Sequence, residues 1–333
     1  MQATALVCDQ DQTFELKTVI LPKLGPDQIM LKTSYSGVSI GTEFALIRNK
    51  ISWGPFPIVT GYMATGIVEQ IGEQVSDVKV GDKVFVRGNV PLKLEDGTDV
   101  SPVTGTHCSH IITTVGGTHG AGILPDDAPM EQASMFVMPA VGYYGVDMSE
   151  PKLEDTVVVY GCGLIGQGVI AACSMRGCKV IAIDVQDRQL QMAKIMGADV
   201  LINAAKTDAL TQLNTISQGG ADVVFECTGI PTLVDTALSL CKRDGKFVWQ
   251  GNYGQAPINF KFLVPHGKRL KTFFPCDDGY LPFRHAVIKH MSQGILPWDK
   301  LITHRIKADQ SPGMYDRINR GDKDIIGVTI DWS

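Results

Sequence analysis

The sequence predicts an α/β fold in which a doubly wound parallel sheet is joined to a second, mainly antiparallel β domain. Two patterns lead to this prediction. From residue 156 onward, apolar strands alternate with helical segments, which is typical of a parallel sheet covered by helices on both faces. Before about residue 138, short strands are separated by turns rich in Gly, Pro and Asp, which is typical of antiparallel sheets. A chain of 333 residues, of which 44% are hydrophobic, is long enough to form two such cores.

The most informative stretch is a glycine-rich turn between two predicted strands. Thr156 to Tyr160 and Lys179 to Ile183 are apolar runs of the kind that form buried parallel strands. The turn between them, Gly161-Cys-Gly-Leu-Ile-Gly166, has the pattern G-x-G-x-x-G and opens a predicted helix. Such glycines allow a tight turn, close approach of the backbone to a pyrophosphate, and close packing of helix against strand. We therefore predict a Rossmann domain in which the residues contacting a dinucleotide include Gly161, Gly163, Leu164, Ile165 and Gly166.

An acidic residue at the end of the second strand indicates which dinucleotide is bound. Asp184 lies 18 residues after Gly166, where a carboxylate can accept hydrogen bonds from a ribose hydroxyl and repel a 2′-phosphate. We therefore expect NAD to be favoured over NADP, although Arg188 could weaken that discrimination. Two alternatives remain: Asp184 could simply cap the next helix, or the domain could be a degenerate one that binds no cofactor.

Composition and charge exclude several functional classes. The chain has 30 basic and 35 acidic residues and a formal net charge of −5, with no basic run, which argues against nucleic acid or an anionic membrane as a partner. The first residues predict an alternating strand rather than a signal peptide, and no apolar run reaches membrane-spanning length. The eight cysteines include no C-x-x-C pair, which indicates buried thiols in a reducing compartment. We therefore expect a cytoplasmic protein with no membrane partner.

The remaining predicted elements follow the same two patterns. In the first domain, strands are predicted at residues 3–7, 29–35, 64–71, 83–87 and 110–115, and helical spacing at 130–147. In the Rossmann domain, helices are predicted at 186–196, 207–217 and 231–242, with strands at 221–226, 246–250 and 270–274. The tail contains a predicted helix at 281–293 and an apolar strand at 325–330 that could return to the first domain. We therefore expect the first domain over 1–138, the Rossmann domain over 139–274 and the returning tail over 275–333.

Short motifs distributed along the whole chain resemble those of one known family. They are Ser36-Gly-Val-Ser-Ile-Gly-Thr-Glu43, Gly61-Tyr-Met-Ala-Thr-Gly66, Val80-Gly-Asp-Lys-Val-Phe85, Met196-Gly-Ala-Asp199, Asp222-Val-Val-Phe-Glu-Cys-Thr-Gly229 and Leu301-Ile-Thr-His304. With the glycine turn, they resemble the medium-chain dehydrogenase/reductase superfamily, to which zinc alcohol dehydrogenases belong. The residues of the first two motifs most closely resemble those of the branch that contains bacteriochlorophyllide dehydrogenase and related sugar or alcohol dehydrogenases. The resemblance implies a GroES-like catalytic domain, built from the first domain and the tail, with the Rossmann domain inserted between them.

Further cofactor contacts are expected at the ends of the Rossmann strands, where open parallel sheets bind ligands. Cys227, Thr228 and Gly229 should lie near the central ribose and phosphates. The resemblance implies three further groups around the nicotinamide: Gly251, Asn252 and Tyr253; Phe273 and Phe274; and, on its other side, Val141 and Gly142. The alternative for the apolar members is ordinary core packing.

The motifs depart from the family at the positions that hold zinc. Members with a catalytic zinc place Cys where this chain has Ser39, His-Glu where it has Tyr62-Met63, and often Cys where it has Met138. These residues provide neither the thiolates nor the imidazole of such sites. The stretch 88–105, which corresponds to the four-cysteine structural zinc lobe, contains no Cys. New ligands could come from His107, Cys108 and His110, but in a strand residues 107 and 110 point to opposite faces, so we expect no metal.

Without zinc, side chains must hold the substrate oxygen and move a proton. Tyr62 is the first candidate because a phenol both donates and accepts hydrogen bonds, although it could simply fill the vacated cavity. Glu43 could act as a base or hold a sugar hydroxyl, or it could be a first-turn helix acid behind a Thr42 cap. Ser39 could relay a proton or only shape the turn.

These observations predict an NAD-dependent, zinc-independent dehydrogenase that transfers hydride between the nicotinamide and a small-molecule secondary alcohol or polyol, or the matching ketone. One alternative is an NAD(P)H-dependent enone or quinone C=C reductase, in which the substrate's own carbonyl stabilises the developing charge. The other is a catalytically inactive nucleotide-binding scaffold or sensor. The family associates through the edge strand of the Rossmann sheet, here 268–274, so the resemblance also implies a homodimer.

Overall fold

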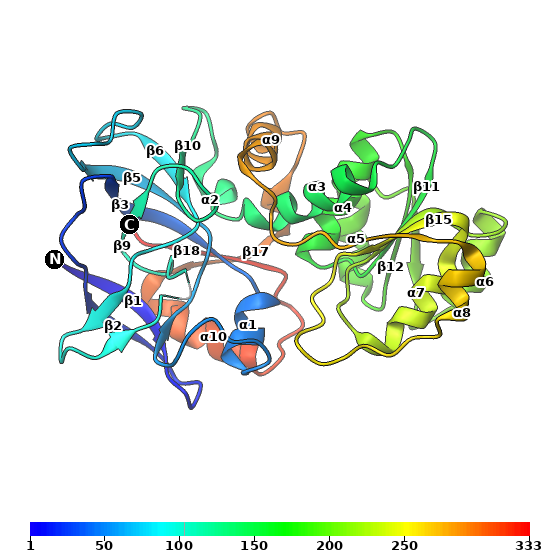
Figure 1. Ribbon diagram of the computed structural model, residues 1–333, viewed down its shortest axis with the longest axis horizontal. Coiled ribbons are helices and arrows are strands. Elements are labelled where there is room, and N and C mark those ends of the chain that lie inside the picture. The colour runs from blue at the N-terminus through cyan, green and yellow to red at the C-terminus, as the bar shows by residue number, and fades with distance from the viewer. Residues whose placement is uncertain (103) are drawn as a thin grey trace. The chain divides into compact units, whose positions relative to one another are not determined.

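The computed structural model describes residues 1–102 and 104–333 (Figure 1). The chain forms two compact units. Unit 1 contains Met1–Phe136 and Tyr280–Ser333, and unit 2 contains Val137–Gly279. Two distant segments of the sequence therefore build unit 1, whereas unit 2 is continuous.

Unit 1 consists mainly of strands. They are β1 (Gln2–Cys8), β2 (Phe14–Ile20), β3 (Gln28–Val38), β4 (Ile58–Val59), β5 (Ala64–Ile71), β6 (Lys83–Val86), β7 (Leu92–Leu94), β8 (Asp99–Val100), β9 (His110–Thr114), β10 (Ala121–Ile123), β17 (Ile302–Lys307) and β18 (Gly327–Asp331). One sheet has the order β4-β1-β2-β7-β8, and the other has the order β10-β6-β5-β3-β18-β17, with β9 also paired to β3. Among the described residues, all these strand pairs are antiparallel except β17 with β18. The predicted mainly antiparallel β domain is thus confirmed.

The helices of unit 1 are short, and the C-terminal ones help to complete its core. They are α1 (Thr42–Ile47), α2 (Met130–Ala133), α9 (Leu281–Ser292) and α10 (Ser311–Asn319), with 3₁₀ turns at Trp298–Leu301 and Ala308–Gln310. Tyr315 of α10 is fully buried, and its ring centroid lies 5.3 Å from that of Phe14 and 5.2 Å from that of Phe44. Ile330 of β18 is buried in the same cluster. Because burying one such side chain contributes roughly 1.5–3 kcal/mol, the tail is an integral part of the unit.

Unit 2 contains a parallel sheet whose strands alternate with helices. Its elements are α3 (Val137–Ser149), β11 (Thr156–Tyr160), α4 (Leu164–Met175), β12 (Lys179–Asp184), α5 (Asp187–Ile195), β13 (Val200–Asn203), α6 (Ala209–Ile216), β14 (Ala221–Glu226), a 3₁₀ turn (Pro231–Leu233), α7 (Val234–Leu240), β15 (Cys241–Trp249), α8 (Leu263–Lys268) and β16 (Lys271–Phe273). The strand order is β13-β12-β11-β14-β15-β16, and the strands are parallel throughout. The direction of winding reverses between β11 and β14. The predicted doubly wound Rossmann sheet is therefore confirmed.

The edge of this sheet differs from the prediction. The strand was predicted at 270–274, and the edge proposed for dimer pairing began earlier, at 268, but Lys268 is the last residue of α8. Arg269 then adopts a left-handed conformation with φ of 53°, which ends the helix. Only the segment of β16 pairs with β15. The edge available for pairing is thus three residues long.

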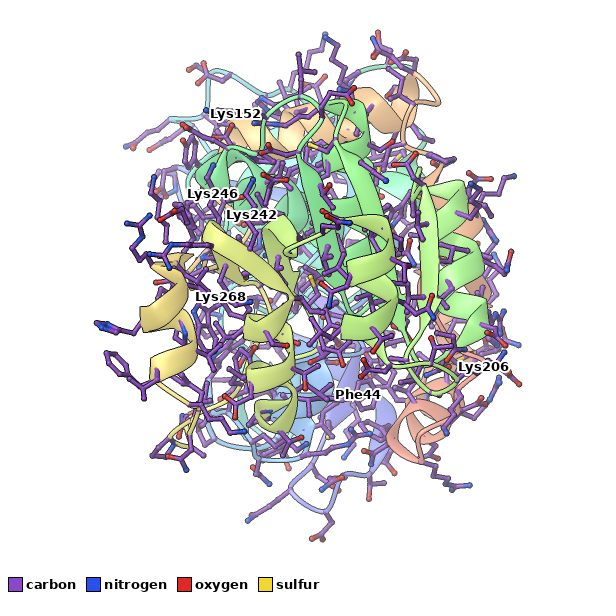
Figure 2. The ribbon with its side chains drawn as sticks, turned by 90° about the vertical axis from the view of Figure 1, so that its right-hand side faces the viewer. Phe44, Lys152, Lys206, Lys242, Lys246 and Lys268 are labelled. Carbon is purple, nitrogen blue, oxygen red and sulfur yellow. The ribbon has the colours of Figure 1, made fainter. Side chains whose placement is uncertain are left out.

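Lysines occupy the amino edge of the unit 2 sheet (Figure 2). The Lys246 ammonium donates a hydrogen bond to the carbonyl oxygen of Ser149 at 2.5 Å, at the end of α3. Lys242, near the start of β15, forms an ion pair with Asp222, near the start of β14. The Lys246 ammonium complements the dipole at the C-terminus of α3, whereas the Lys242–Asp222 pair joins β15 to β14 at the edge opposite the glycine turn.

None of the helices in residues 1–102 and 104–333 combines the length and apolar content needed to span a membrane.

Candidate functional site

The glycine turn joins β11 to α4, and its steric requirements fit a dinucleotide. Gly161 has a φ of +100°, which side chains rarely tolerate, and a Cβ on Gly166 would lie 2.0 Å from the carbonyl oxygen of Gly161. Gly163 has open space where a Cβ would be, and it precedes α4 without a side-chain cap. Leu164 and Ile165 form the first turn of α4. The helix therefore begins with backbone N–H groups next to open space, as binding of a pyrophosphate requires.

Asp184 lies at the carboxyl end of β12 and supports the glycine turn. Its Oδ2 accepts a hydrogen bond from the backbone N–H of Cys162 at 2.8 Å, and its Oδ1 accepts one from that of Gln186 at 2.9 Å. Gln186 is the N-cap of α5, so Asp184 does not cap that helix. The carboxylate is half-buried, and each oxygen keeps a further lone pair. Arg188, in the first turn of α5, is exposed.

The turn after β14 is organised by Glu226, which sequence reasoning did not single out. The Glu226 side chain is fully buried. Its Oε1 accepts the backbone N–H of Thr228 at 2.9 Å and also the Thr228 hydroxyl, and its Oε2 accepts the N–H of Gly229 at 3.1 Å. Burial raises the pKa of the neighbouring Cys227 thiol. The predicted cofactor residues 227–229 are therefore held by a buried carboxylate.

The turn after β15 is attached to the same group. The Tyr253 hydroxyl donates to Glu226 Oε2, and the backbone N–H of Gly251 donates to the Glu226 carbonyl oxygen at 2.7 Å. Burial, together with the Glu226 carboxylate, raises the pKa of Tyr253. A Cβ on Gly229 would lie 2.5 Å from the carbonyl oxygen of Asn252, so the two turns touch through their backbones. The structure thus brings residues 227–229 and 251–253 together.

The other residues predicted to contact the cofactor lie in α3 and at the end of β16. Val141 and Gly142 lie within α3, where a Cβ on Gly142 would be 2.6 Å from a backbone nitrogen of α4. Close packing of the two helices therefore already requires this glycine. Phe273 ends β16, and Phe274 is 67% exposed and stacks on Trp249 with ring centroids 5.6 Å apart.

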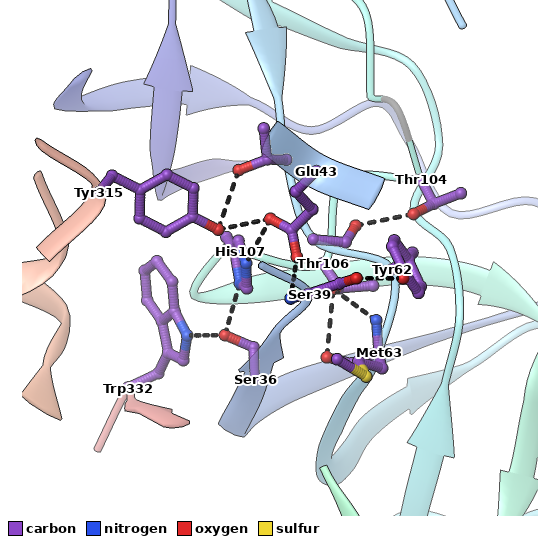
Figure 3. A network of polar contacts seen from close by, with 12 residues as sticks. Ser36, Ser39, Glu43, Tyr62, Met63, Thr104, Thr106, His107, Tyr315 and Trp332 are labelled. Carbon is purple, nitrogen blue, oxygen red and sulfur yellow. Dashed lines mark hydrogen bonds and ion pairs between the residues drawn. The ribbon is translucent and has the colours of Figure 1, made fainter. Parts of the chain in front are cut away.

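Unit 1 contains a buried pair of hydroxyl groups, from Tyr62 and Ser39, at two positions that were expected from the resemblance to replace zinc ligands (Figure 3). The Tyr62 hydroxyl donates to Ser39 Oγ at 2.5 Å, and both residues are buried. Burial raises the pKa of Tyr62 to about 12, although the hydrogen bond to Ser39 opposes the shift. The Arg87 guanidinium lies 5.7 Å from the centroid of the Tyr62 ring, and the ring centroids of Trp53 and Tyr62 lie 6.3 Å apart in an edge-on arrangement. The phenol is therefore a protonated hydrogen-bond donor at neutral pH.

Glu43 lies beside this pair and is only 1% exposed. Its Oε1 accepts the backbone N–H of Ser39 at 2.7 Å, while its Oε2 accepts the Tyr315 hydroxyl at 2.5 Å and lies 3.2 Å from His107 Nε2. Protein groups thus surround the carboxylate, so a direct role as base or sugar clamp is not favoured. Glu43 does lie in the first turn of α1, but Thr42 is not the cap, because the N-cap is the preceding glycine.

His107 links Glu43 to the last strand of unit 1 (Figure 3). The Trp332 indole N–H donates to Ser36 Oγ at 2.8 Å, and Ser36 Oγ lies 2.8 Å from His107 Nδ1. The indole can only donate, so the serine hydroxyl can donate onward to Nδ1. We therefore assign the imidazole proton to Nε2, which faces the Glu43 carboxylate. Sequence reasoning missed this chain of contacts because Trp332 and Ser36 are 296 residues apart.

The residues that the resemblance assigns to the family's zinc positions do not fit zinc. The hydroxyl groups of Ser39 and Tyr62 bond to one another. Met63 and Met138 are buried and offer only thioethers, and Met138 belongs to α3 of unit 2. Structural and catalytic zinc sites in proteins use thiolates, imidazoles and carboxylates, so this set lacks suitable donors.

The alternative ligands do not form a cluster either. His107 Nε2 faces Glu43, whereas His110 lies in β9 with its Nε2 3.5 Å from a carboxylate oxygen of Glu69. Burial raises the pKa of Cys108 to about 12, which disfavours a thiolate. In the described part of the chain, no three His, Cys, Asp or Glu side chains are grouped so that they could hold a metal ion.

Comparison with known proteins identifies the chain's relatives. An alcohol dehydrogenase GroES-like domain model matches residues 25–140, and a zinc-binding dehydrogenase model matches residues 165–291. An (R,R)-butanediol dehydrogenase from Neisseria gonorrhoeae is 28% identical over 279 residues, which cover 78% of this chain and 76% of the relative. An erythritol/L-threitol dehydrogenase from Mycolicibacterium smegmatis is 25% identical over 352 residues, which cover 98% and 96%.

A solved structure shows the same fold. An alcohol dehydrogenase from Escherichia coli, in complex with NADH, has a TM-score of 0.84 at 20% identity and covers 99% of each chain. The GroES-like model falls almost entirely on unit 1, and the zinc-binding dehydrogenase model falls mainly on unit 2. Together with relatives that match from end to end, they show that the chain belongs to the medium-chain dehydrogenase/reductase superfamily, among the proteins that resemble zinc alcohol dehydrogenases.

Proposed function

We propose that this protein is an NAD-dependent oxidoreductase that acts on a secondary alcohol or polyol, or on the matching ketone, without a catalytic metal. The observation that carries the proposal is the buried hydroxyl pair of Tyr62 and Ser39, at two positions that the family resemblance assigns to zinc ligands. The substrate class is supported by relatives that act on butanediol and on erythritol or threitol.

The chain's own residues account for cofactor binding. NAD would supply or accept the hydride at its nicotinamide. The turn Gly161–Gly166 would hold the pyrophosphate, and Asp184 would accept a hydrogen bond from the adenosine ribose. The paired turns 227–229 and 251–253 would face the remainder of the dinucleotide, because they end parallel strands on the same edge of the sheet. The preference for NAD depends on Asp184, whose charge would repel a 2′-phosphate.

We assign the proton transfer to the hydroxyl pair. Because its pKa is raised to about 12, Tyr62 keeps its proton until the substrate oxygen becomes strongly basic. For ketone reduction it can turn its O–H from Ser39 to that oxygen and donate the proton, and the phenolate then regains a proton from water. Alcohol oxidation requires the phenolate as the base, so we expect that direction to become faster as the pH rises towards the raised pKa. Ser39 orients the phenol through its 2.5 Å contact.

Glu43 receives a positioning role in this proposal. Its carboxylate binds the backbone N–H of Ser39 and is itself held by Tyr315 and His107. It therefore fixes the position of Ser39 and, through Ser39, that of the Tyr62 hydroxyl.

Binding and turnover measurements test the proposal directly. NADH binding is followed by fluorescence, and turnover is followed with vicinal diols, polyols, secondary alcohols, ketones and enones. Turnover of alcohols or ketones is expected. Turnover of enones alone would indicate a C=C reductase, and NADH binding without any turnover would indicate a scaffold or sensor.

The metal-free claim has a separate test. Elemental analysis should find no stoichiometric zinc, and a chelator should leave activity unchanged. Zinc at one equivalent per chain, with activity lost on chelation and restored by zinc, would overturn the claim.

A further inference from the structure

Glu226 is a buried carboxylate that the proposed reaction does not use. It is the last residue of β14, and it pairs in register with Tyr160, the last residue of β11. The direction of winding reverses between these two strands. In open α/β sheets, ligands bind outside the carboxyl ends of the strands at this point. Glu226 thus lies directly beneath the expected ligand edge.

Four protein groups donate to the Glu226 carboxylate. Oε1 accepts the N–H and the hydroxyl of Thr228, and Oε2 accepts the N–H of Gly229 and the hydroxyl of Tyr253. An ionised carboxylate has about four lone-pair sites and no proton to donate, so this set of donors matches the ionised form. Hydrogen bonds to a charged group are also stronger than those between neutral groups.

These bonds connect two turns that follow different strands. Thr228 and Gly229 belong to the turn after β14, and Tyr253 belongs to the turn after β15. The backbones are already in contact, because a Cβ on Gly251 would lie 2.4 Å from the backbone nitrogen of Gly229. The shape of one turn therefore depends on that of the other, and both depend on Glu226.

We propose that Glu226 is a positioning residue for the dinucleotide, which fixes the turns after β14 and β15 in the shape that receives the cofactor. Its effect passes through Thr228 and Tyr253. The proposal rests on the proposed function, because it assumes that the dinucleotide binds at this edge.

Asp222 provides a matched control on the same strand. It is the second residue of β14, and its Oδ2 accepts the backbone N–H of Thr156 at 2.9 Å. Its other oxygen contacts the Lys242 ammonium. Asp222 thus also joins neighbouring strands through a carboxylate, but it does so at the amino edge of the sheet, away from the ligand edge.

The test compares Glu226→Gln with Asp222→Asn by fluorescence titration of NADH, with thermal unfolding of each variant measured in parallel. In Glu226→Gln, an amide N–H2 group takes the place of one carboxylate oxygen and faces the two donors that this oxygen bound. Because these hydrogen bonds are lost and the turns can shift, the NADH dissociation constant should rise by roughly tenfold or more. Asp222→Asn should lower the unfolding temperature but leave the dissociation constant within about twofold of the wild type.

Other results of these titrations would contradict the proposed function or this inference. If wild-type protein does not bind NADH, the proposed function fails, and this inference fails with it. If the wild type binds and folded Glu226→Gln binds equally well, the inference alone is wrong. Equal weakening in both variants would assign the effect to general destabilisation and would also overturn it. Should Glu226→Gln fail to fold, Tyr253→Phe removes a single donor and should weaken NADH binding by about threefold; unchanged binding in that variant would count against the proposal.

Discussion

At Asp184, one carboxylate serves the protein and, by our proposal, the cofactor. It holds the glycine turn through the N–H of Cys162 at 2.8 Å, and it would also recognise the ribose. Asp184→Asn removes the charge and keeps one acceptor oxygen, while its amide N–H2 opposes one of the two backbone donors. The ratio of the NADH and NADPH affinities, rather than either affinity alone, therefore reports the loss of charge. Asp184→Asn should therefore narrow the preference for NADH over NADPH by roughly 1–3 kcal/mol, because repulsion of the 2′-phosphate is lost.

Titration of each variant with NADH and NADPH measures this preference. Asp199→Asn is the control, since Asp199 Oδ2 accepts the backbone N–H of Val180 at 2.7 Å, at the other end of β12. It should leave the preference unchanged. Tighter binding of NADPH than of NADH by the wild type would show that Asp184 does not select NAD.

Tyr62 is the second residue whose role one substitution can decide. Tyr62→Phe keeps the ring against Arg87 and removes only the hydroxyl that bonds to Ser39. If the phenol holds the substrate oxygen, kcat/KM should fall by roughly 10²-fold while NADH affinity is unchanged. Steady-state kinetics and NADH titration provide the two readouts. Tyr35→Phe in β3 is a control outside this site, and a silent Tyr62→Phe would mean that the ring only fills space.

At the scale of elements, α1, α10 and β18 meet around one buried charge. α1 supplies Glu43, α10 supplies Tyr315, and β18 is followed by Trp332, which reaches His107 through Ser36. The tail therefore contributes hydrogen-bond donors to a carboxylate in the first segment of unit 1, as well as apolar contacts. Since an unpaired buried charge is costly, the elements depend on one another.

This dependence predicts the effect of Tyr315→Phe. The variant keeps the ring contacts with Phe14 and Phe44 but removes the hydroxyl that donates to Glu43. We expect the free energy of unfolding to fall by about 1–3 kcal/mol, because a donor to a buried charged group is lost. Urea denaturation measures the change, and Tyr35→Phe again serves as the control. A loss of the same size in both variants would contradict the special role of the Glu43 contact.

For the whole molecule, the stability at high pH should depend on two buried side chains that are uncharged in the folded protein, the Tyr62 phenol and the Cys108 thiol. Burial raises the pKa of Tyr62 from 10.0 to about 12 and that of Cys108 from 9.0 to about 12. The folded protein holds these protons more tightly than the unfolded chain does. The two groups therefore contribute fully to the free energy of unfolding at a pH below their pKa values in the unfolded chain. This contribution is lost as the pH rises through their pKa values in the folded protein, so the free energy of unfolding should fall between about pH 9 and 12. Urea denaturation across that range measures the slope, which Cys108→Ala should reduce; a flat profile would contradict the burial of these groups.

Association is the other property of the whole molecule. β16 is the edge strand of the unit 2 sheet, and its three residues leave one side unpaired among the described strands. We predict a homodimer formed through this edge. Light scattering at micromolar concentration should give twice the mass of 36.1 kDa per chain. A monomer mass across a dilution series would exclude this mode of association.

The sequence by itself determined the parts of the protein that depend on local patterns. Apolar runs predicted β11, β14 and β5 with their observed bounds. This was possible because the pattern of apolar residues that indicates a buried strand lies within a few consecutive residues. The glycine turn was predictable for the same reason, since its steric demands act between Gly161 and Gly166. The extension of the dimer edge back to Lys268 was wrong, because α8 occupies that position.

Only the tertiary structure decided which side chains share an environment. Glu43 is as plausible a first-turn helix acid as a base when its neighbours in sequence are considered, and only the approach of Tyr315, 272 residues away, shows that its carboxylate is enclosed. The residues next to Glu226 in the sequence show only that it ends a predicted strand, and the structure adds that Tyr253 and Thr228 both donate hydrogen bonds to its carboxylate. Hydrogen bonds and desolvation act over a few ångströms in space, so the state of a buried polar group depends on contacts that the order of residues along the chain does not specify.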